Sequence, residues 1–269
     1  MRGNDRGRSG GTAVTTPETR RRRIVELVTD RNGLSVDELI DEFDVSGSTI
    51  RRDLRALADR NLIERTHGGA MPATHARSER PFDQKVVEGL ERKRAIGRRA
   101  AREIQQGQVV FFDSGTTTFQ IAREAPTDGS FVSVTNSPLL AMELGKDDGI
   151  VKMTGGSFRE ESMGLVGRPA QSYVRTSNFD LAFVGTNGID EKGALTSPIE
   201  EEAAVKTEVI ASAAQTVIVA DLTKFGERTF RQFATLEDVD AVITDGRVPD
   251  RFHDAFEAAD TEWLEGVAE

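Results

Sequence analysis

Three arginines lie close together in the first quarter of the chain, at Arg51, Arg52 and Arg55, just after the hydroxyl residues Ser48 and Thr49. Arginine can bond guanine O6 and N7 in a bidentate way, and serine and threonine hydroxyls suit phosphates or bases. An arginine-rich helix surface is, however, more often simply solvated. Whether these side chains read DNA therefore depends on the element that carries them.

That element is predicted to be a helix running from about Ser48 to about Arg60. Ile50, Leu54 and Leu57 recur at helical spacing, which places them on one buried face and leaves the arginines on the other. This arrangement is typical of a recognition helix, whose N-terminal half contacts base edges in the major groove.

The flanking residues complete a small domain. Pro17 follows a capping threonine and opens a first helix, and Ser35 to Glu38 forms a capping box that opens a second helix. After the third helix, Leu62 to Thr66 alternates as a strand into a glycine-tipped wing. Together these signals predict a winged helix-turn-helix domain over residues 17–71, which is much more specific than any one of them.

A second group of polar residues follows an apolar strand near the middle of the chain. Val109 to Phe112 leads into Asp113-Ser114-Gly115-Thr116-Thr117 and then into a predicted helix. Backbone N–H groups and hydroxyls at a helix N-terminus can hold a phosphate, although helix capping is the commoner explanation of this pattern. The spacing and the lysine of a nucleotide-binding P-loop are absent.

Residues 107–269 alternate short apolar strands with helices, which predicts an α/β domain with a largely parallel sheet. Polar loops that follow parallel strands meet at one edge of such a sheet and can converge on one crevice. The strands are expected at 109–113, 131–135, 150–154, 181–185, 217–220 and 239–244, and the helices at 117–124, 139–144, 201–214 and 251–258.

Two further segments have no domain pattern of their own. Residues 1–16 lack apolar periodicity and are expected to form a disordered arm. Residues 72–106 are expected to be a linker and a connecting helix, the helix running unbroken from Asp83 to Gln106.

Composition limits the function. The chain has no cysteine, and its three histidines lack metal-ligand spacing, so neither a metal nor another cofactor is expected. No apolar run is long enough for a membrane span and no signal peptide is recognisable, so the protein is expected in the cytoplasm, without a membrane partner.

The net charge of −10 is unevenly distributed. Residues 106–269 hold 13 basic and 28 acidic residues, whereas residues 20–71 hold 10 of each. A neutral reading domain attracts DNA little without sequence recognition, which argues against a merely structural DNA-binding protein. The acidic, arginine-rich composition suits either a protein of a salt-loving host or an ordinary acidic cytosolic protein.

The sequence resembles the DeoR family of regulators. The resemblance is carried by Val45 to Leu54, Leu62 to Arg65 and His67 to Ala70, with Asn61 where the family usually has glycine. It implies that Ser46 begins the recognition helix and that the wing approaches the DNA backbone. The DNA-binding residues expected from both arguments are Ser46, Ser48, Thr49, Arg51, Arg52, Arg55, His67, Gly68 and Gly69.

The resemblance extends from about Pro17 to Gly246. It implies a sugar-isomerase and CoA-transferase-like fold for the second domain and a phosphorylated sugar or polyol as effector. Lys206 is equally well explained as an exposed lysine paired with Glu202. The effector-binding residues that the resemblance implies are Ser114, Gly115, Thr116 and Thr117 for the phosphate, Asn136, Ser137, Gly155 and Gly156 for the sugar, Lys206 and Lys224 as further cations, and Asp113, mainly to fix its loop.

An isomerase reaction is the alternative function, because one of Glu200, Glu201 and Glu202 could act as a general base. Acidic residues at a helix start more often stabilise the helix dipole, and the attached DNA reader favours a sensor over an enzyme. One winged helix reads only a short half-site, so a homodimer or homotetramer on double-stranded operator DNA is expected. Repression is favoured over activation.

Overall fold

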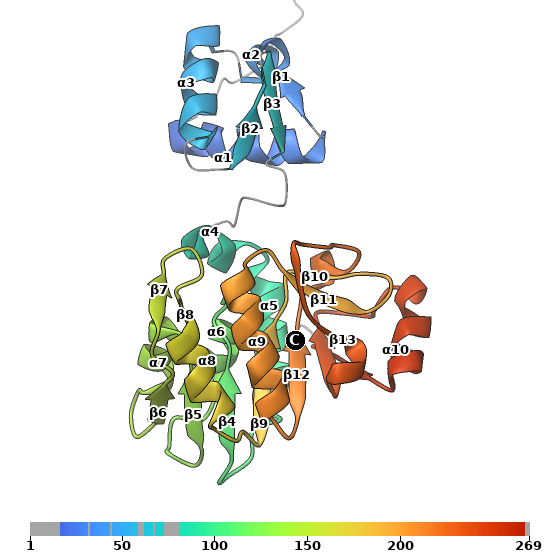
Figure 1. The fold of residues 1–269 in the computed structure, drawn as a ribbon. Coiled ribbons are helices and arrows are strands. Elements are labelled where there is room, and N and C mark those ends of the chain that lie inside the picture. The colour runs from blue at the N-terminus through green and yellow to red at the C-terminus, as the bar shows by residue number, and fades with distance from the viewer. Residues whose placement is uncertain are drawn as a thin grey trace, which may run out of the picture. The chain divides into compact units, whose positions relative to one another are not determined.

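The computed structural model describes residues 17–31, 33–43, 45–58, 62–66, 68–72 and 81–266. The expected arm, Asn61, His67 and residues 73–80 of the expected linker lie outside the described residues. The chain divides into two compact units, Met1–Ser78 and Glu79–Glu269, whose elements are labelled in Figure 1.

The described part of the small unit consists of three helices and a three-stranded antiparallel sheet. Ile50, Leu54 and Leu57 are buried against the first two helices, so the predicted apolar face of the third helix is confirmed. The capping box is confirmed too, because Ser35 Oγ accepts from Glu38 N at 3.2 Å while Glu38 Oε2 accepts from Ser35 N at 2.8 Å. In chain order the elements are α1 (Pro17–Asp30), β1 (Leu34–Ser35), α2 (Val36–Phe43), α3 (Gly47–Ala58), β2 (Ile63–Arg65) and β3 (Gly69–Pro72).

The large unit is built on a seven-stranded sheet in the order β15-β14-β12-β9-β4-β5-β6, with every neighbouring pair parallel. Successive residues of its central strands enter opposite cores, as the two-residue period of a strand requires. In β4, Phe111 lies in one core, and Val110 and Phe112 lie in the other. The sheet strands are β4 (Val109–Phe112), β5 (Val132–Thr135), β6 (Ile150–Met153), β9 (Leu181–Gly185), β12 (Thr216–Val219), β14 (Ala241–Thr244) and β15 (Glu262–Glu265).

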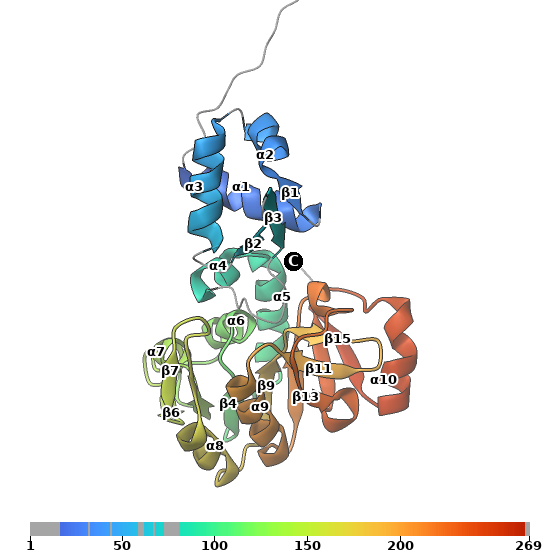
Figure 2. The ribbon, with the colours of Figure 1, turned by 45° about the horizontal axis from the view of Figure 1, so that its top comes forward.

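Helices cover both faces of this sheet (Figures 1 and 2). The apolar residues of α5, α6 and α7 pack on one face, and those of α8, α9 and α10 pack on the other. The predicted α/β class with a parallel sheet is therefore confirmed. The helices of this unit are α4 (Phe82–Val87), α5 (Leu90–Ala101), α6 (Thr116–Glu124), α7 (Pro138–Leu144), α8 (Arg168–Arg175), α9 (Glu200–Ser212) and α10 (His253–Ala259), with the 3-10 turns η1 (Leu222–Lys224), η2 (Leu236–Asp238) and η3 (Asp250–Phe252).

The sequence did not reveal two antiparallel elements of the large unit. A hairpin joins β7 (Ser157–Arg159) to β8 (Gly164–Val166), and a small sheet joins β10 (Gly188–Ile189), β11 (Ala194–Ser197) and β13 (Arg231–Thr235). These strands are two to five residues long, too short for an apolar alternation to show in the sequence.

The expected unbroken helix from Asp83 to Gln106 is wrong. The chain turns at Glu88 and Gly89, where Gly89 adopts a φ of 59° that glycine takes without strain. The second piece, α5, is a core element of the large unit rather than a free rod, because a Cβ added at Gly97 would lie 2.9 Å from the backbone of Gln120 in α6. Among the described residues, no helix has the length and apolar character needed to span a membrane.

Candidate DNA-binding surface and effector site

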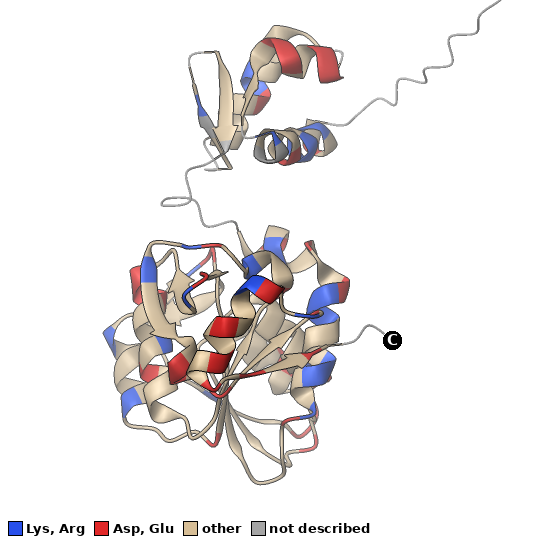
Figure 3. Ribbon diagram, turned by 90° about the vertical axis from the view of Figure 1, so that its right-hand side faces the viewer, with Lys and Arg blue, Asp and Glu red and all other residues tan. Residues whose placement is uncertain are grey.

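The N-terminal half of α3 presents the residues expected to read DNA. Arg51, Arg52 and Arg55 are exposed on the side opposite the buried Ile50 and Leu54. Ser46 is exposed as well, and its Oγ accepts a hydrogen bond from Thr49 N at 3.3 Å, which caps the helix. The carboxylate of these turns, Asp53, is buried, so the exposed side chains of this face are donors, although both signs of charge occur elsewhere on the unit (Figure 3).

Asp53 holds this helix in place. It is buried, and its two carboxylate oxygens accept from Arg20 Nε and Arg21 Nε, each at 2.7 Å. Asp53 therefore links α3 to α1. Since charge-assisted hydrogen bonds are directional, this contact fixes the orientation of the recognition helix on its support.

The glycines of the wing have different surroundings. Gly68 is exposed, and its carbonyl accepts from Val36 N at 2.8 Å, which ties the wing to the start of α2. Gly69 is buried beside β1, where a Cβ would lie 2.1 Å from Leu34 O. Close packing against β1 thus explains why position 69 is a glycine, whereas the position of Gly68 is open to solvent.

In the large unit, the loop Asp113–Thr117 joins the carboxyl end of β4 to α6. Ser114 N donates to Asn136 Oδ1 at 2.8 Å, so the loops after β4 and β5 lie side by side, as the parallel register of these strands requires. Gly115 is the N-cap of α6 and no side chain caps the helix there. The first-turn N–H groups of a helix have no intrahelical acceptor, and they are available to an anion where nothing else caps them.

The hairpin β7–β8 lies over these loops. Ser137 Oγ donates to Met163 O at 2.8 Å, and Leu165 N donates to Asn136 O at 2.6 Å. Gly155 and Gly156, both exposed with positive φ, form the turn into the hairpin. A Cβ at Gly156 would lie 2.5 Å from Val166 O, so this glycine is required by the hairpin itself.

Lys206 is buried, not exposed, and it pairs with Asp113 rather than with Glu202. Its Nζ also donates to Gly185 O at 2.9 Å, and Asp113 Oδ2 accepts from Gly185 N at 3.1 Å. The ion pair of Lys206 with Asp113 joins α9 to the carboxyl ends of β4 and β9, next to Ser114. Lys224 follows β12, which β9 separates from β4 in the sheet, so the structure does not bring Lys224 into this cluster of contacts.

Arg159 and Ser162, which the hairpin contributes to this edge, could not be predicted from the sequence, because no spacing links them to Ser114. Arg159 Nε lies 3.4 Å from Glu202 Oε1, and Ser162 is buried. Recognising these residues would have required the antiparallel pairing of residues 157–159 with residues 164–166.

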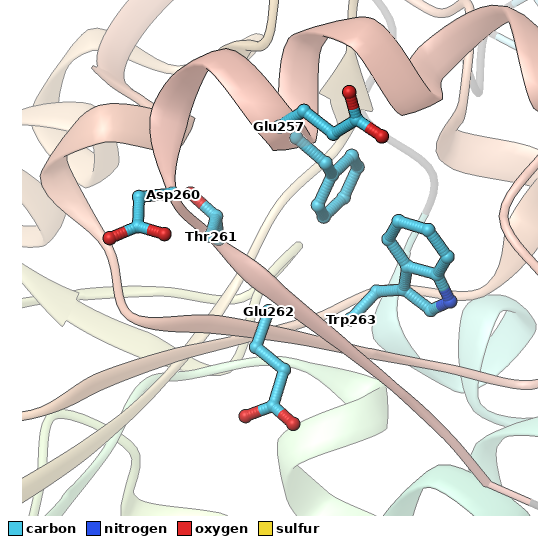
Figure 4. A pocket seen from close by; sticks show the side chains of 6 residues that line it. Glu257, Asp260, Thr261, Glu262 and Trp263 are labelled. Carbon is cyan, nitrogen blue, oxygen red and sulfur yellow. The ribbon is translucent and has the colours of Figure 1, made fainter.

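A hollow of about 340 Å³ lies elsewhere on the large unit, beside α10 and β15. Figure 4 shows Trp263 and the carboxylates of Glu257, Asp260 and Glu262 around it. Three carboxylates repel an anion, so this hollow does not suit a phosphorylated ligand. No group of His, Asp and Glu that could hold a metal ion occurs in the described part of the chain.

A helix-turn-helix unit with an exposed basic helix, followed by an α/β unit with polar loops at the carboxyl edge of its sheet, defines a DNA-binding transcription regulator with a sensor domain. The comparisons identify the family. Residues 20–75 match the DeoR-like helix-turn-helix domain and residues 88–246 match the DeoR C terminal sensor domain, so the chain belongs to the DeoR family.

Two relatives cover nearly the whole chain. The HTH-type transcriptional regulator GlpR of Haloferax volcanii is 51% identical over 252 residues, which are 94% of this chain and 99% of the relative. The glycerol-3-phosphate regulon repressor of Escherichia coli is 33% identical over 228 residues, 84% of this chain and 90% of the relative. Among solved structures, ribose 5-phosphate isomerase A of Methanocaldococcus jannaschii is similar at a TM-score of 0.38 and 15% identity, covering 49% of this chain and 53% of that chain, which is too low to bear on function.

Proposed function

We propose that the protein is a repressor that binds operator DNA through α3 and is released from it by a phosphorylated sugar or polyol. The observation that carries the first half is the sidedness of α3. Its arginines are exposed opposite a fully buried apolar face, and Asp53 anchors the helix from below without neutralising Arg51 or Arg52. Guanine-reading by Arg51 and Arg52 follows from their place in the first turns of the helix.

The effector is proposed to bind where the loops after β4 and β5 meet the N-terminus of α6. Support comes from the uncapped first turn at Gly115 and from the hydrogen bond between Ser114 N and Asn136 Oδ1, which preorganises the two loops. Because the Escherichia coli relative is named the glycerol-3-phosphate regulon repressor, glycerol 3-phosphate is the first compound to test.

A sensor is favoured over an isomerase. Glu200 and Glu201 are exposed in the first turn of α9, as dipole-stabilising residues would be. Glu202 is buried, and its Oε1 lies 3.4 Å from Arg159 Nε, so it is held in an ion pair and not open to a substrate as a general base must be. We place the protein in the cytoplasm with its DNA, as a homodimer or homotetramer that reads paired half-sites.

The test combines DNA binding with turnover. Fluorescence anisotropy of labelled promoter fragments is measured with the full-length protein at the salt of its host, with glycerol 3-phosphate or glycerol added, and the same mixtures are analysed for isomerised product. Release by glycerol 3-phosphate alone, without product, is expected. Product formation without any specific DNA binding would overturn the regulator and restore the isomerase.

A further inference from the structure

The hairpin β7–β8 is fixed to the proposed effector site by contacts from β8 and from its turn. Arg159 lies directly opposite Gly164 in the antiparallel register. Leu165 N donates to Asn136 O at 2.6 Å, and Met163 O accepts from Ser137 Oγ at 2.8 Å. The residues between the two strands are therefore held against the loop that follows β5.

Ser162, in the turn of this hairpin, has a buried hydroxyl group with no partner. Ser162 is 4% exposed, and its Oγ makes no hydrogen bond within the described part of the chain. Most buried polar atoms have a hydrogen-bond partner, and leaving one without is unfavourable. The orphaned hydroxyl therefore indicates a position that a ligand completes.

Gly164 shows that the Ser162 hydroxyl lies beside the loop that leads into α6. A Cβ added at Gly164 would lie 2.6 Å from Ser114 Oγ and 3.2 Å from Ser162 Oγ. The hydroxyls of the α6 entry loop and of the hairpin turn are thus both packed closely against Gly164, so a group that bonds one of them is within reach of the other. This is a second observation, independent of the helix N-terminus, that points to the same place.

Arg159 supplies the positive charge. Residues that face each other in an antiparallel pair project from the same side of the hairpin, so Arg159 projects from the side on which Gly164 faces the Ser114 and Ser162 hydroxyls. Its side chain is 25% exposed, its Nε is 3.4 Å from Oε1 of the buried Glu202, and its Nη2 is 3.7 Å from Oε2 of the exposed Glu161. Lys206, in contrast, is neutralised by Asp113 in a buried pair. A guanidinium that keeps water contact can exchange one anion for another.

We infer that the hairpin closes the effector site, with Ser162 bonding the phosphoryl oxygens of the effector and Arg159 leaving Glu202 to bind the same group. The inference rests on the proposed function and names the residues that recognise the anion. A phosphoryl group carries close to two negative charges and three strong acceptors, which suits a hydroxyl and a guanidinium together. Because Glu202 lies in the first turn of α9, the exchange releases the hairpin from that helix when the ligand binds.

The experiment is calorimetric titration of full-length protein with glycerol 3-phosphate, inorganic phosphate and glycerol. Ser162→Ala and Arg159→Gln are each expected to weaken binding of the two phosphate compounds about tenfold or more, the size expected for one hydrogen bond to a charged group. Glu202→Gln removes the competing carboxylate and is expected to tighten binding, which a merely structural pair would not do.

Arg175 provides a matched control. It pairs with Glu208 of the same helix α9, its Nη2 lying 2.6 Å from Glu208 Oε1, but on the exposed surface. Arg175→Gln is expected to leave phosphate affinity unchanged. Operator binding without ligand and the thermal midpoint of each variant show whether it is folded. If Arg159→Gln does not fold, Ser162→Ala, which deletes only one oxygen atom, decides the test.

The outcomes separate the two ideas. Wild-type protein that binds neither phosphate compound would overturn the proposed effector together with the role of the hairpin. If wild-type protein and Ser162→Ala bind glycerol 3-phosphate equally well, only the proposed role of the hairpin is overturned. Weaker binding by Glu202→Gln would overturn the proposed exchange of partners by Arg159.

Discussion

Two helices of this molecule begin with nearly the same sequence. Ser46-Gly47-Ser48-Thr49 starts α3 in the small unit, and Ser114-Gly115-Thr116-Thr117 starts α6 in the large unit. At α3, Ser46 is exposed and caps its own helix through Thr49 N. At α6, Ser114 and Thr116 are buried, and the backbone of Ser114 is bound by Asn136 from another strand.

The difference shows that burial, rather than local sequence, decides which anion such a helix start can meet. Both N-termini carry the partial positive charge of a helix dipole. The exposed one is open to a polyanion as large as DNA, with arginines beside it. The buried one is, in our proposal, the place where a small phosphorylated group binds beside Ser114 and the hairpin.

The two units also use buried carboxylates in parallel ways. Asp53 receives two arginines of α1, whose side chains are 10% and 31% exposed, whereas Asp113 receives Lys206, which is 5% exposed. The pair in the large unit is therefore more fully removed from water, and losing one partner there leaves the other with less solvent to stabilise it.

The largest effect is expected from breaking this pair. Asp113→Asn or Lys206→Met should each lower the free energy of unfolding of the large unit by about 3–5 kcal/mol, because one charge stays buried and unpaired. Trp263, the sole tryptophan, lies in the large unit, so its fluorescence during urea denaturation reports the change. The double variant should recover part of the loss, and single variants as stable as wild type would refute the assignment.

The second effect concerns the exposed helix start. Arg51→Ala and Arg52→Ala should each weaken operator binding by about 1–3 kcal/mol, the range for one bidentate base contact. Fluorescence anisotropy is measured with operator DNA and with scrambled DNA. Loss of a base contact weakens binding to the operator alone, whereas loss of a phosphate contact weakens binding to both. Arg22→Ala, at a side chain 74% exposed on α1, is the matched control. Unchanged operator affinity in both variants would rule out this recognition surface.

Much of this comparison could be predicted from the sequence, because periodic patterns report local structure. The apolar face of α3, the capping box at Ser35 and the parallel strands of the large unit all follow from spacing within one element. The loop Asp113–Thr117 could be placed at a sheet edge for the same reason.

Contacts between distant segments could not be predicted. Lys206 meets Asp113 across 93 residues, and Asp53 meets Arg20 across 33, and no pattern within a single element encodes such pairs. The hairpin that contributes Arg159 and Ser162 has strands of three residues, too short for periodicity. Gly89 breaks the expected long helix because a single glycine can end a helix that charged and apolar residues otherwise favour.

A third prediction uses pH to contrast a buried cation with the exposed arginines of α3. Burial lowers the pKa of Lys93 to about 8, although the charge of Asp221 opposes this. Lys93 Nζ donates to Glu88 O at 2.6 Å, where the chain turns between α4 and α5. Since the unfolded chain keeps an ordinary lysine pKa, it binds the extra proton between about pH 8 and pH 10.5.

The free energy of unfolding of the large unit should therefore rise with pH across that window, by about 1–2 kcal/mol after allowing for partial hydration. Below about pH 8 both states are protonated, and this contribution is constant. Denaturation followed by Trp263 fluorescence at several pH values measures it. Lys93→Met should flatten the rise, and a variant that keeps the full rise would assign it to other groups.

The smallest expected effect returns to the two serines. Ser46→Ala removes a helix cap and should destabilise α3 by about 1 kcal/mol, raising the hydrogen-exchange rates of its amides roughly fivefold. Ser114→Ala should leave exchange in α6 almost unchanged, because Ser114 does not cap that helix. Its side chain makes one long contact, with Asn136 Nδ2 at 3.4 Å, so its loss should instead appear in phosphate affinity. Equal increases in amide exchange for Ser46→Ala and Ser114→Ala would show that both hydroxyls act as helix caps. That result would contradict the contrast between α3 and α6.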